Sequence, residues 1–143
     1  MPGARRLIRL CENQGTTLGI VSNAQFYTPL LFSALVGKSL PKLGLPDATS
    51  VWSYRMRAAK PSTCLFEEAL SRLGLPAQSV VYVGNDCLND VWTARECGLR
   101  TVLFAGDRRS LRRRATDPRC QNLVPDAVIT ELAQLPALLS TET

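Results

Sequence analysis

The stretch VVYVGNDCLNDVWTA, which runs from Val80 to Ala94, decides the fold of this chain. It begins with an apolar run of the kind that is buried in parallel sheets, and Gly84 then allows the backbone to turn sharply. A cluster of two amides and two carboxylates follows at once, namely Asn85, Asp86, Asn89 and Asp90. This pattern predicts a buried strand, a tight turn and a helix, with acidic groups gathered at the carboxyl end of the strand.

Asp86 and Asp90 are a candidate pair of metal ligands. They are one helical turn apart, which would hold both carboxylates on the same side of a helix. Hard oxygen ligands in this arrangement suit Mg²⁺, which usually binds one or two carboxylates and keeps several water ligands. The alternative is a turn and helix cap rich in asparagine and aspartate, without a metal. The stretch by itself leaves both interpretations open.

Two earlier segments place further polar side chains beside predicted strands and helices. Leu18–Val21 is an apolar strand that ends in Ser22 and Asn23, and Lys60 stands in a Lys-Pro pair directly before a helix. Ligands of parallel α/β sheets bind beyond the carboxyl ends of the strands. A position at or just after a strand end therefore favours a single site made of Ser22, Lys60, Asp86 and Asp90.

The order of these segments resembles the C-terminal part of the core of the haloacid dehalogenase (HAD) superfamily, over nearly the whole chain. In that family four motifs converge at the ends of parallel strands: a nucleophilic aspartate, a serine or threonine, a lysine, and an acidic pair for Mg²⁺. The resemblance implies that Ser22 donates its hydroxyl to a phosphoryl oxygen and that Lys60 neutralises the charge of that group. Asn23 is expected either to orient the same oxygen or to cap the next helix. The resemblance thus implies catalytic roles for Ser22, Lys60 and Asp90, substrate binding by Ser22, Asn23 and Lys60, and Mg²⁺ binding by Asp86 and Asp90.

The acidic motif departs from the commonest family pattern, because Asn85 stands where an aspartate usually follows the glycine. Aligned through Asn89 and Asp90, the motif keeps the common Asn-Asp pair and has a neutral first position. Aligned through Asp86, it becomes Asp-x-x-x-Asp, a spacing that the superfamily also uses. We prefer the second alignment, but the sequence leaves open whether Asn85 or Asp86 takes the first acidic position.

The first motif of the family is missing, since no aspartate precedes Ser22 and Glu12 is the only acidic residue before it. The strand that would carry the nucleophile and the cap domain that usually selects the substrate are missing as well. Pro2 and Gly3 look like the turn that enters the helix before the second motif. We therefore expect a truncated HAD-like hydrolase, the C-terminal portion of a Mg²⁺-dependent phosphatase of small phosphorylated molecules, inactive as this chain alone. The alternative is a regulatory module that binds phosphate and metal without catalysis.

Composition describes an ordinary globular protein and excludes several other classes. The 143 residues are 45% apolar and 20% charged, and their apolar runs are far shorter than the roughly 20 residues of a membrane helix. No signal peptide is visible, because Arg5, Arg6 and Arg9 interrupt any apolar region near the start. Five cysteines without a Cys-x-x-Cys pair and the absence of histidine argue against a zinc site. We expect free thiols, a cytoplasmic location and no membrane partner.

The net charge of +5 is concentrated in Asp107–Arg119, called the arginine segment below. It has six arginines against two aspartates, a local charge of +4. Such a segment could bind the phosphates of a small substrate or of a nucleic acid, or could be a solvated face. Aromatic residues do not alternate with these arginines, so nucleic acid is not the expected partner.

Strands and helices alternate along the chain, which predicts an α/β fold: a Rossmann-like, HAD-type parallel sheet with helices on both faces, in a single partial core domain over residues 1–143. Helices are predicted at Ala4–Asn13, Phe26–Val36, Ser62–Leu73, Val91–Cys97 and Glu131–Leu139. Strands are predicted at Thr17–Val21, Ser50–Tyr54, Val80–Val83, Thr101–Phe104 and Ala127–Ile129. In the family topology, the missing first strand belongs between the strands that end at Ser22 and at Val83. The two unpaired edges would then favour self-association or a complementing segment.

Overall fold

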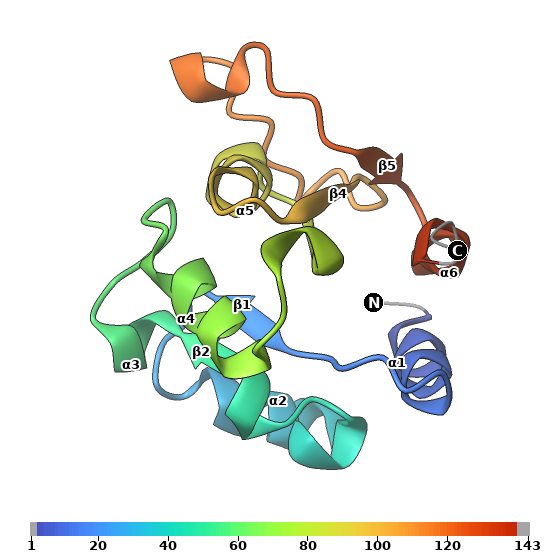
Figure 1. The fold of residues 1–143 in the computed structure, drawn as a ribbon. Helices are drawn as coiled ribbons and strands as arrows, with labels where there is room; N and C mark the ends of the chain where they lie inside the picture. Colours follow the sequence, from blue (N-terminus) through green and yellow to red (C-terminus); the bar gives the residue numbers. More distant parts are fainter. Residues whose placement is uncertain (1–2, 140–143) are drawn as a thin grey trace. The chain divides into compact units, whose positions relative to one another are not determined.

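The computed structural model describes residues 3–139 and divides them into two compact units. The N-terminal unit is Ala4–Gly74, and the C-terminal unit comprises the described residues from Leu75 onward together with Gly3. All strand pairs in both units are parallel, which confirms the predicted α/β class (Figure 1). The prediction of one core domain over the whole chain stays a prediction. Pro2, predicted to lie in the turn before the first helix, falls outside the described residues.

The N-terminal unit is built on two short parallel strands that lie side by side (Figure 1). Its helices and strands are α1 (Ala4–Asn13), β1 (Ile20–Ser22), α2 (Thr28–Val36), β2 (Ser50–Trp52), α3 (Ser53–Met56) and α4 (Cys64–Leu73). Two 3-10 turns, Pro41–Leu43 and Asp47–Thr49, lie between α2 and β2. The register places Ser22, the last residue of β1, opposite Trp52, so both strands end at the same level.

Helix α4 forms because its apolar residues recur at helical spacing on one stripe. Leu65, Phe66 and Ala69 on this stripe are buried, and Leu65 and Ala69 join Val51 of β2 in one core cluster. Gly74 ends the helix in the left-handed conformation, at φ 63°, and its N–H donates to the carbonyl of Leu70 at 3.0 Å. The helix thereby fixes where the preceding loop, which contains Lys60, meets the two strands.

The C-terminal unit contains three parallel strands in the order β3-β4-β5. Its elements are β3 (Val81–Gly84), the π-helical turn η4 (Cys87–Trp92), α5 (Thr93–Glu96), β4 (Arg100–Phe104), β5 (Ala127–Ile129) and α6 (Leu135–Leu139). Short 3-10 turns occupy Ala77–Ser79, Pro118–Cys120 and Leu132–Gln134. The apolar core of this unit comes from β4, β5 and the helical turns, with Val91, Ala94, Val102 and Ile129 at most 4% exposed. None of the helices in residues 3–139 has the length and apolar content to cross a membrane.

Each unit has a strand that is paired on one side only. Among the described residues, β1 pairs with β2 alone, and β3 pairs with β4 alone. Strands β2 and β5 also have a single partner each in the described part of the chain, so the missing strand that the sequence predicts beside β1 and β3 stays a prediction. An open edge exposes backbone donors and acceptors that another strand can bind.

Most of the predicted strands and helices have limits that differ from those in the structure, and three of these differences bear on the candidate site. The first strand begins at Ile20 rather than Thr17, and β2 ends at Trp52 because Ser53 starts a helical turn. The helix predicted from Val91 is preceded by the π-helical turn from Cys87, in which the Thr93 hydroxyl donates to the Leu88 carbonyl at 2.9 Å. Asn89 and Asp90 therefore lie within this turn, whereas Asn85 and Asp86 precede it.

Asp126 ties the start of β5 to the start of β4. Its carboxylate accepts from the backbone N–H of Thr101 at 2.7 Å and from the Thr101 hydroxyl at 3.0 Å. The backbone hydrogen bond from Thr101 is the largest cause of the lowered pKa of Asp126, and the Thr101 hydroxyl lowers it further. The charged carboxylate is therefore preferred in the folded state.

Asp126→Ala is expected to lower the free energy of unfolding by about 1 kcal/mol at neutral pH, since Asp126 is solvent-exposed. Because the folded pKa is below the unfolded value, this contribution is complete above about pH 4 and is lost as the pH falls through the folded pKa. Urea unfolding of both proteins between pH 7 and pH 2 measures the difference. A difference that grows toward low pH would contradict this assignment.

Candidate functional site

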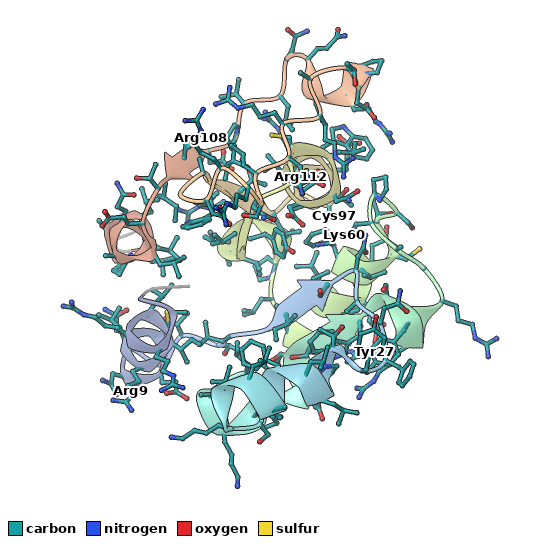
Figure 2. The ribbon with its side chains drawn as sticks, turned by 180° about the vertical axis from the view of Figure 1, so that it is seen from behind. Arg9, Tyr27, Lys60, Cys97, Arg108 and Arg112 are labelled. Carbon is teal, nitrogen blue, oxygen red and sulfur yellow. The ribbon has the colours of Figure 1, made fainter. Side chains whose placement is uncertain are left out.

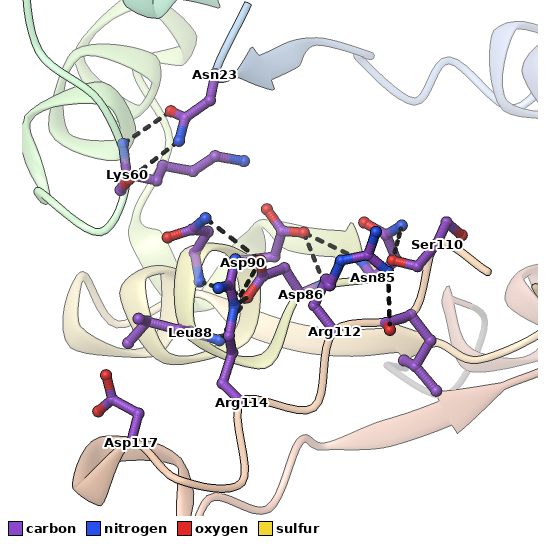
Figure 3. Close-up of polar contacts among 12 residues, drawn as sticks. Asn23, Lys60, Asn85, Asp86, Leu88, Asp90, Ser110, Arg112, Arg114 and Asp117 are labelled. Atoms are coloured by element: carbon purple, nitrogen blue, oxygen red, sulfur yellow. Dashed lines mark hydrogen bonds and ion pairs between the residues drawn. The ribbon is translucent and has the colours of Figure 1, made fainter. Parts of the chain in front are cut away.

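Lys60 is held at the end of β1 by three hydrogen bonds within the N-terminal unit. The side-chain amide of Asn23 accepts from the Lys60 backbone N–H at 2.8 Å and donates to the Lys60 carbonyl at 3.0 Å (Figure 3). The Lys60 ammonium donates to the carbonyl of Val21 at 3.1 Å and lies 5.8 Å from the ring centre of Phe66. Lys60 is only 8% exposed, so its charge is directed to this strand end and not into bulk solvent.

Ser22 is the residue next to the carbonyl that accepts from Lys60. It is half-buried, and its hydroxyl has no hydrogen-bond partner among the residues that the structure describes. A hydroxyl donor and a lysine ammonium thus share the carboxyl end of β1. Together they can bind an anionic oxygen.

The alternative role for Asn23, a cap on the next helix, is not found in the structure. The cap residue of α2 is Tyr27, which makes no side-chain cap hydrogen bond. Both amide atoms of Asn23 are engaged with the Lys60 backbone. A second link, in which Ser53 Oγ accepts from the Ala24 N–H and donates to the Ala24 carbonyl, ties the ends of β1 and β2 together.

Asp90 folds back over the end of β3 in the C-terminal unit. Its Oδ2 atom accepts from the backbone N–H groups of Asn85 and Asp86, both at 3.0 Å, and its Oδ1 atom accepts from the Tyr82 hydroxyl at 3.3 Å. Loss of hydration and the neighbouring Asp90 carboxylate raise the pKa of Tyr82 well above its usual value, so Tyr82 stays a donor. A Cβ atom at Gly84 would collide with Asp90, so this close approach requires glycine.

Asp86 is the N-cap of the π-helical turn and the partner of an arginine. Its Oδ1 atom accepts from the backbone N–H groups of Leu88 at 3.0 Å and Asn89 at 3.1 Å. The guanidinium of Arg114 donates through Nη2 to Oδ2 at 2.7 Å and through Nε to both oxygens at 3.2 Å. Burial raises the pKa of Asp86, but the hydrogen bonds from Arg114, Asn89 and Leu88 outweigh it and hold the pKa below its usual value.

The donor chemistry of this turn decides which oxygens could hold a cation. No group of three or more histidine, cysteine, aspartate or glutamate side chains that could hold a metal occurs within residues 3–139. Mg²⁺ needs fewer, since it keeps several waters and often binds one or two carboxylates. The carboxylate of Asp90 and the side-chain oxygen of Asn85, whose Nδ2 donates to the Ser110 carbonyl at 3.0 Å, are oxygen ligands of the type that Mg²⁺ binds. Asp86 suits Mg²⁺ less well, because a guanidinium already neutralises its carboxylate.

The predicted residues gather in two groups. Ser22, Asn23 and Lys60 come together in the N-terminal unit, whereas Asp86 and Asp90 come together in the C-terminal unit. The structure places each group at the carboxyl end of a parallel strand, as predicted. That the two groups form one site stays a prediction.

Sequence reasoning did not single out Arg114. It recognised the arginine segment only as a phosphate-binding segment or a solvated face, and Arg108 and Arg112 extend from the loop after β4 (Figure 2). In the structure Arg114 binds Asp86, and Arg119 binds Asp117 at 2.8 Å. Since Arg114 and Asp86 are 28 residues apart, no local pattern could reveal their pairing.

Comparison with known proteins gives concordant matches. The family model described as HAD-hydrolase-like matches residues 57–135, more than half of the chain. A haloacid dehalogenase-like hydrolase domain-containing protein 3 from Danio rerio is 32% identical over 138 residues, covering 95% of this chain and 51% of the relative. A ribulose-1,5-bisphosphate 5-phosphatase from Halopiger xanaduensis is 28% identical over 142 residues, covering 98% of this chain and 56% of the relative. The chain therefore spans about half the length of these relatives.

The fold of this chain is also similar to that of a solved HAD phosphatase structure. A HAD phosphatase from Thermococcus onnurineus superposes with a TM-score of 0.76 at 25% identity, over 99% of this chain and 59% of that one. A match over so much of the chain identifies the strands and helices as a Rossmann-like fold of the type found in that protein.

Proposed function

Because the chain belongs to the HAD-like hydrolase family, we propose that it contributes the phosphate-binding and metal-binding residues of a Mg²⁺-dependent phosphatase of small phosphorylated molecules. The phosphatase activity named for the Halopiger xanaduensis relative supports the reaction class. The five cysteines, all unpaired, suit the reducing cytoplasm that we propose as its location.

The position of Lys60 is the observation that carries this proposal. Lys60 is 8% exposed, and its ammonium donates to the carbonyl of Val21, the residue before Ser22, which places a positive charge at the end of β1. The phosphoryl group would accept a hydrogen bond from Ser22, and Lys60 would offset its negative charge. Asn23 would act through Lys60, whose backbone it holds on both sides.

Asp90 supplies the chain's carboxylate for Mg²⁺ in this proposal, and its two backbone hydrogen bonds fix the carboxylate's direction. When bound, Mg²⁺ supplies charge neutralisation for the phosphoryl oxygens and activates water. With Ser22 and Lys60, Asp90 completes the set of residues that we propose as catalytic. We also propose that residues 1–143 form a single partial core domain.

A phosphate-binding module without catalysis is the second candidate function. It is favoured by the end of β1, where a lysine ammonium and the neighbouring serine could bind an anion without any nucleophile. Binding and turnover must therefore be measured separately.

The 143-residue chain is expected to bind inorganic phosphate at the end of β1 and to show no turnover of an aryl phosphate with Mg²⁺. Amide shifts in a phosphate titration should concentrate at Ile20–Ala24 and around Lys60. Lys60→Met should weaken binding about tenfold or more, because the buried charge is lost. Turnover is measured on the same samples by release of the aryl alcohol.

Lys42→Met is the matched control, because Lys42 is an exposed lysine of the same unit. It should leave phosphate binding unchanged. Phosphate binding that is insensitive to Lys60→Met would contradict the proposed function. Turnover that disappears in Lys60→Met but survives in Lys42→Met would contradict the expected inactivity and reveal another nucleophile in the chain.

A further inference from the structure

Residues 110–114 of the arginine segment, called the strap below, run beside the acidic turn and are joined to it by backbone hydrogen bonds. The Cys87 N–H donates to the Arg112 carbonyl at 2.8 Å, and the Arg112 N–H donates to the Asn85 carbonyl at 2.9 Å. The side chain of Asn85 adds a third link, to the Ser110 carbonyl (Figure 3). The backbone at Arg112 pairs in parallel with the backbone at Asp86. The arginine segment is therefore held next to the candidate metal ligands.

Arg114 lies at the end of this strap with its guanidinium on Asp86. Its backbone has a positive φ of 53°, a conformation that residues other than glycine rarely adopt. Its side chain is 43% exposed, whereas that of Asp86 is 10% exposed. The arginine therefore reaches in from the surface to a carboxylate that is mostly shielded from water, where a charge needs a partner.

Both carboxylate oxygens of Asp86 are saturated with donors. Oδ1 accepts from two backbone N–H groups and from Arg114 Nε. Oδ2 accepts from Nε and Nη2 of Arg114 and from the side-chain amide of Asn89, the last at 3.3 Å. Direct coordination of a cation at Asp86 would bring it against the guanidinium that already occupies the accessible side. Like charges at this separation repel each other.

We propose that Arg114 is the built-in counter-cation of Asp86, which excludes a divalent cation from this carboxylate and leaves Asp90 as the chain's carboxylate ligand. The inference rests on the Mg²⁺ site of the proposed function and assigns its ligands within the chain. It also makes Arg114 and Mg²⁺ competitors, so each weakens the binding of the other at Asp86. Asp86 then acts as a positioning residue that caps the turn and anchors the strap.

Magnesium titration of the full chain, followed by amide shifts of Gly84–Val91 at constant ionic strength, tests this assignment without any measurement of turnover. The unchanged chain should bind Mg²⁺ in the millimolar range, on the order of −4 kcal/mol. Asp86→Asn should change that affinity less than twofold, whereas Asp90→Asn should abolish binding. Arg114→Gln should raise the affinity about tenfold, and adding Asp86→Asn to it should cancel the gain.

Arg119→Gln is the matched control, because it removes the same charge from an ion pair of similar length with Asp117. It should leave the Mg²⁺ affinity at Gly84–Val91 unchanged. Should glutamine at position 114 open the strap, Arg114→Lys provides a second variant, which keeps the charge but not the two-point pairing and should raise the affinity by a smaller factor.

Two results would overturn the assignment. One is an Asp86→Asn protein that loses as much affinity as Asp90→Asn; the other is an affinity that Arg114→Gln and Arg114→Lys both leave unchanged. Binding that appears only after Arg114 is replaced, and only with Asp86 present, would support Arg114 as the counter-cation of Asp86 but would overturn Asp90 as the ligand, and it would contradict the Mg²⁺ dependence in the proposed function.

Discussion

Gly84→Ala is expected to lower the free energy of unfolding of the C-terminal unit by about 3 kcal/mol. The added methyl group would meet the Cβ and the carboxyl group of Asp90, which lie directly over Gly84. Asp90 cannot simply rotate away, since its carboxylate holds two backbone N–H groups of the acidic turn. Either β3 moves or the turn loses both hydrogen bonds, and each outcome removes Asp90 from its place. Urea unfolding monitored by circular dichroism measures the loss.

Gly74→Ala provides the control for the loss of glycine itself. Gly74 has a positive φ of 63° but open space around its missing Cβ, so alanine there should cost only about 1 kcal/mol. The steric explanation has a second test in the pair Gly84→Ala with Asp90→Gly. If the collision is the cause, Gly84→Ala should cost at least about 1 kcal/mol less when Asp90 is absent. Equal losses for Gly84→Ala in both backgrounds would refute it.

A peptide with an apolar strand that ends in Asp-x-Asp-x-Thr is expected to raise the melting temperature of the chain. Strands β1 and β3 each have one partner among the described residues, so each offers an open edge for a parallel strand. A ligand that binds only the folded form, at 100 times its dissociation constant, adds about 2.7 kcal/mol. For a chain of this size that corresponds to an increase of about 10 °C. Scanning calorimetry with and without peptide gives the shift, and the amides of β1 and β3 show where it binds.

The control peptide has the same composition with a proline at the strand centre, which removes a backbone donor and should abolish the effect. Without peptide, the chain is expected to self-associate or to melt early. A monodisperse monomer that melts above about 60 °C and ignores both peptides would show that the open edges need no partner. That result would favour the self-sufficient phosphate-binding module over the catalytic reading.

The parallel α/β class and the strand-end placement of the candidate residues were predictable because they depend on local patterns. The apolar run before Gly84 and the stripe on α4 each determine an element from a few neighbouring residues. The limits of the elements were less predictable, since they depend on distant contacts. Strand β2 ends at Trp52, for example, where Ser53 begins a helical turn and its hydroxyl bonds to the backbone of Ala24, 29 residues away.

The partners of the candidate residues could not be read from the sequence for the same reason. Asn23 and Lys60 are 37 residues apart, and a side-chain amide that binds a distant backbone has no sequence signature. The sequence favoured Asp86 over Asn85 as the first acidic ligand because of the Asp-x-x-x-Asp spacing, and it could not show the guanidinium beside Asp86. The composition of the arginine segment gives no reason to expect one arginine rather than another beside Asp86. In the structure, the backbone of the segment places Arg114 there.

The two hydrogen bonds between the Asn23 side chain and the Lys60 backbone have a consequence for the thermodynamics of ligand binding. An unrestrained lysine side chain loses up to about 2 kcal/mol of rotamer entropy when it is immobilised, and fixing its backbone costs a further 1–2 kcal/mol. Here the backbone of Lys60 is clamped on both sides and its ammonium rests on Val21 before any anion arrives. Lys60 therefore loses its conformational entropy during folding and not when phosphate binds. More of the electrostatic attraction between lysine and phosphate then contributes to the binding free energy.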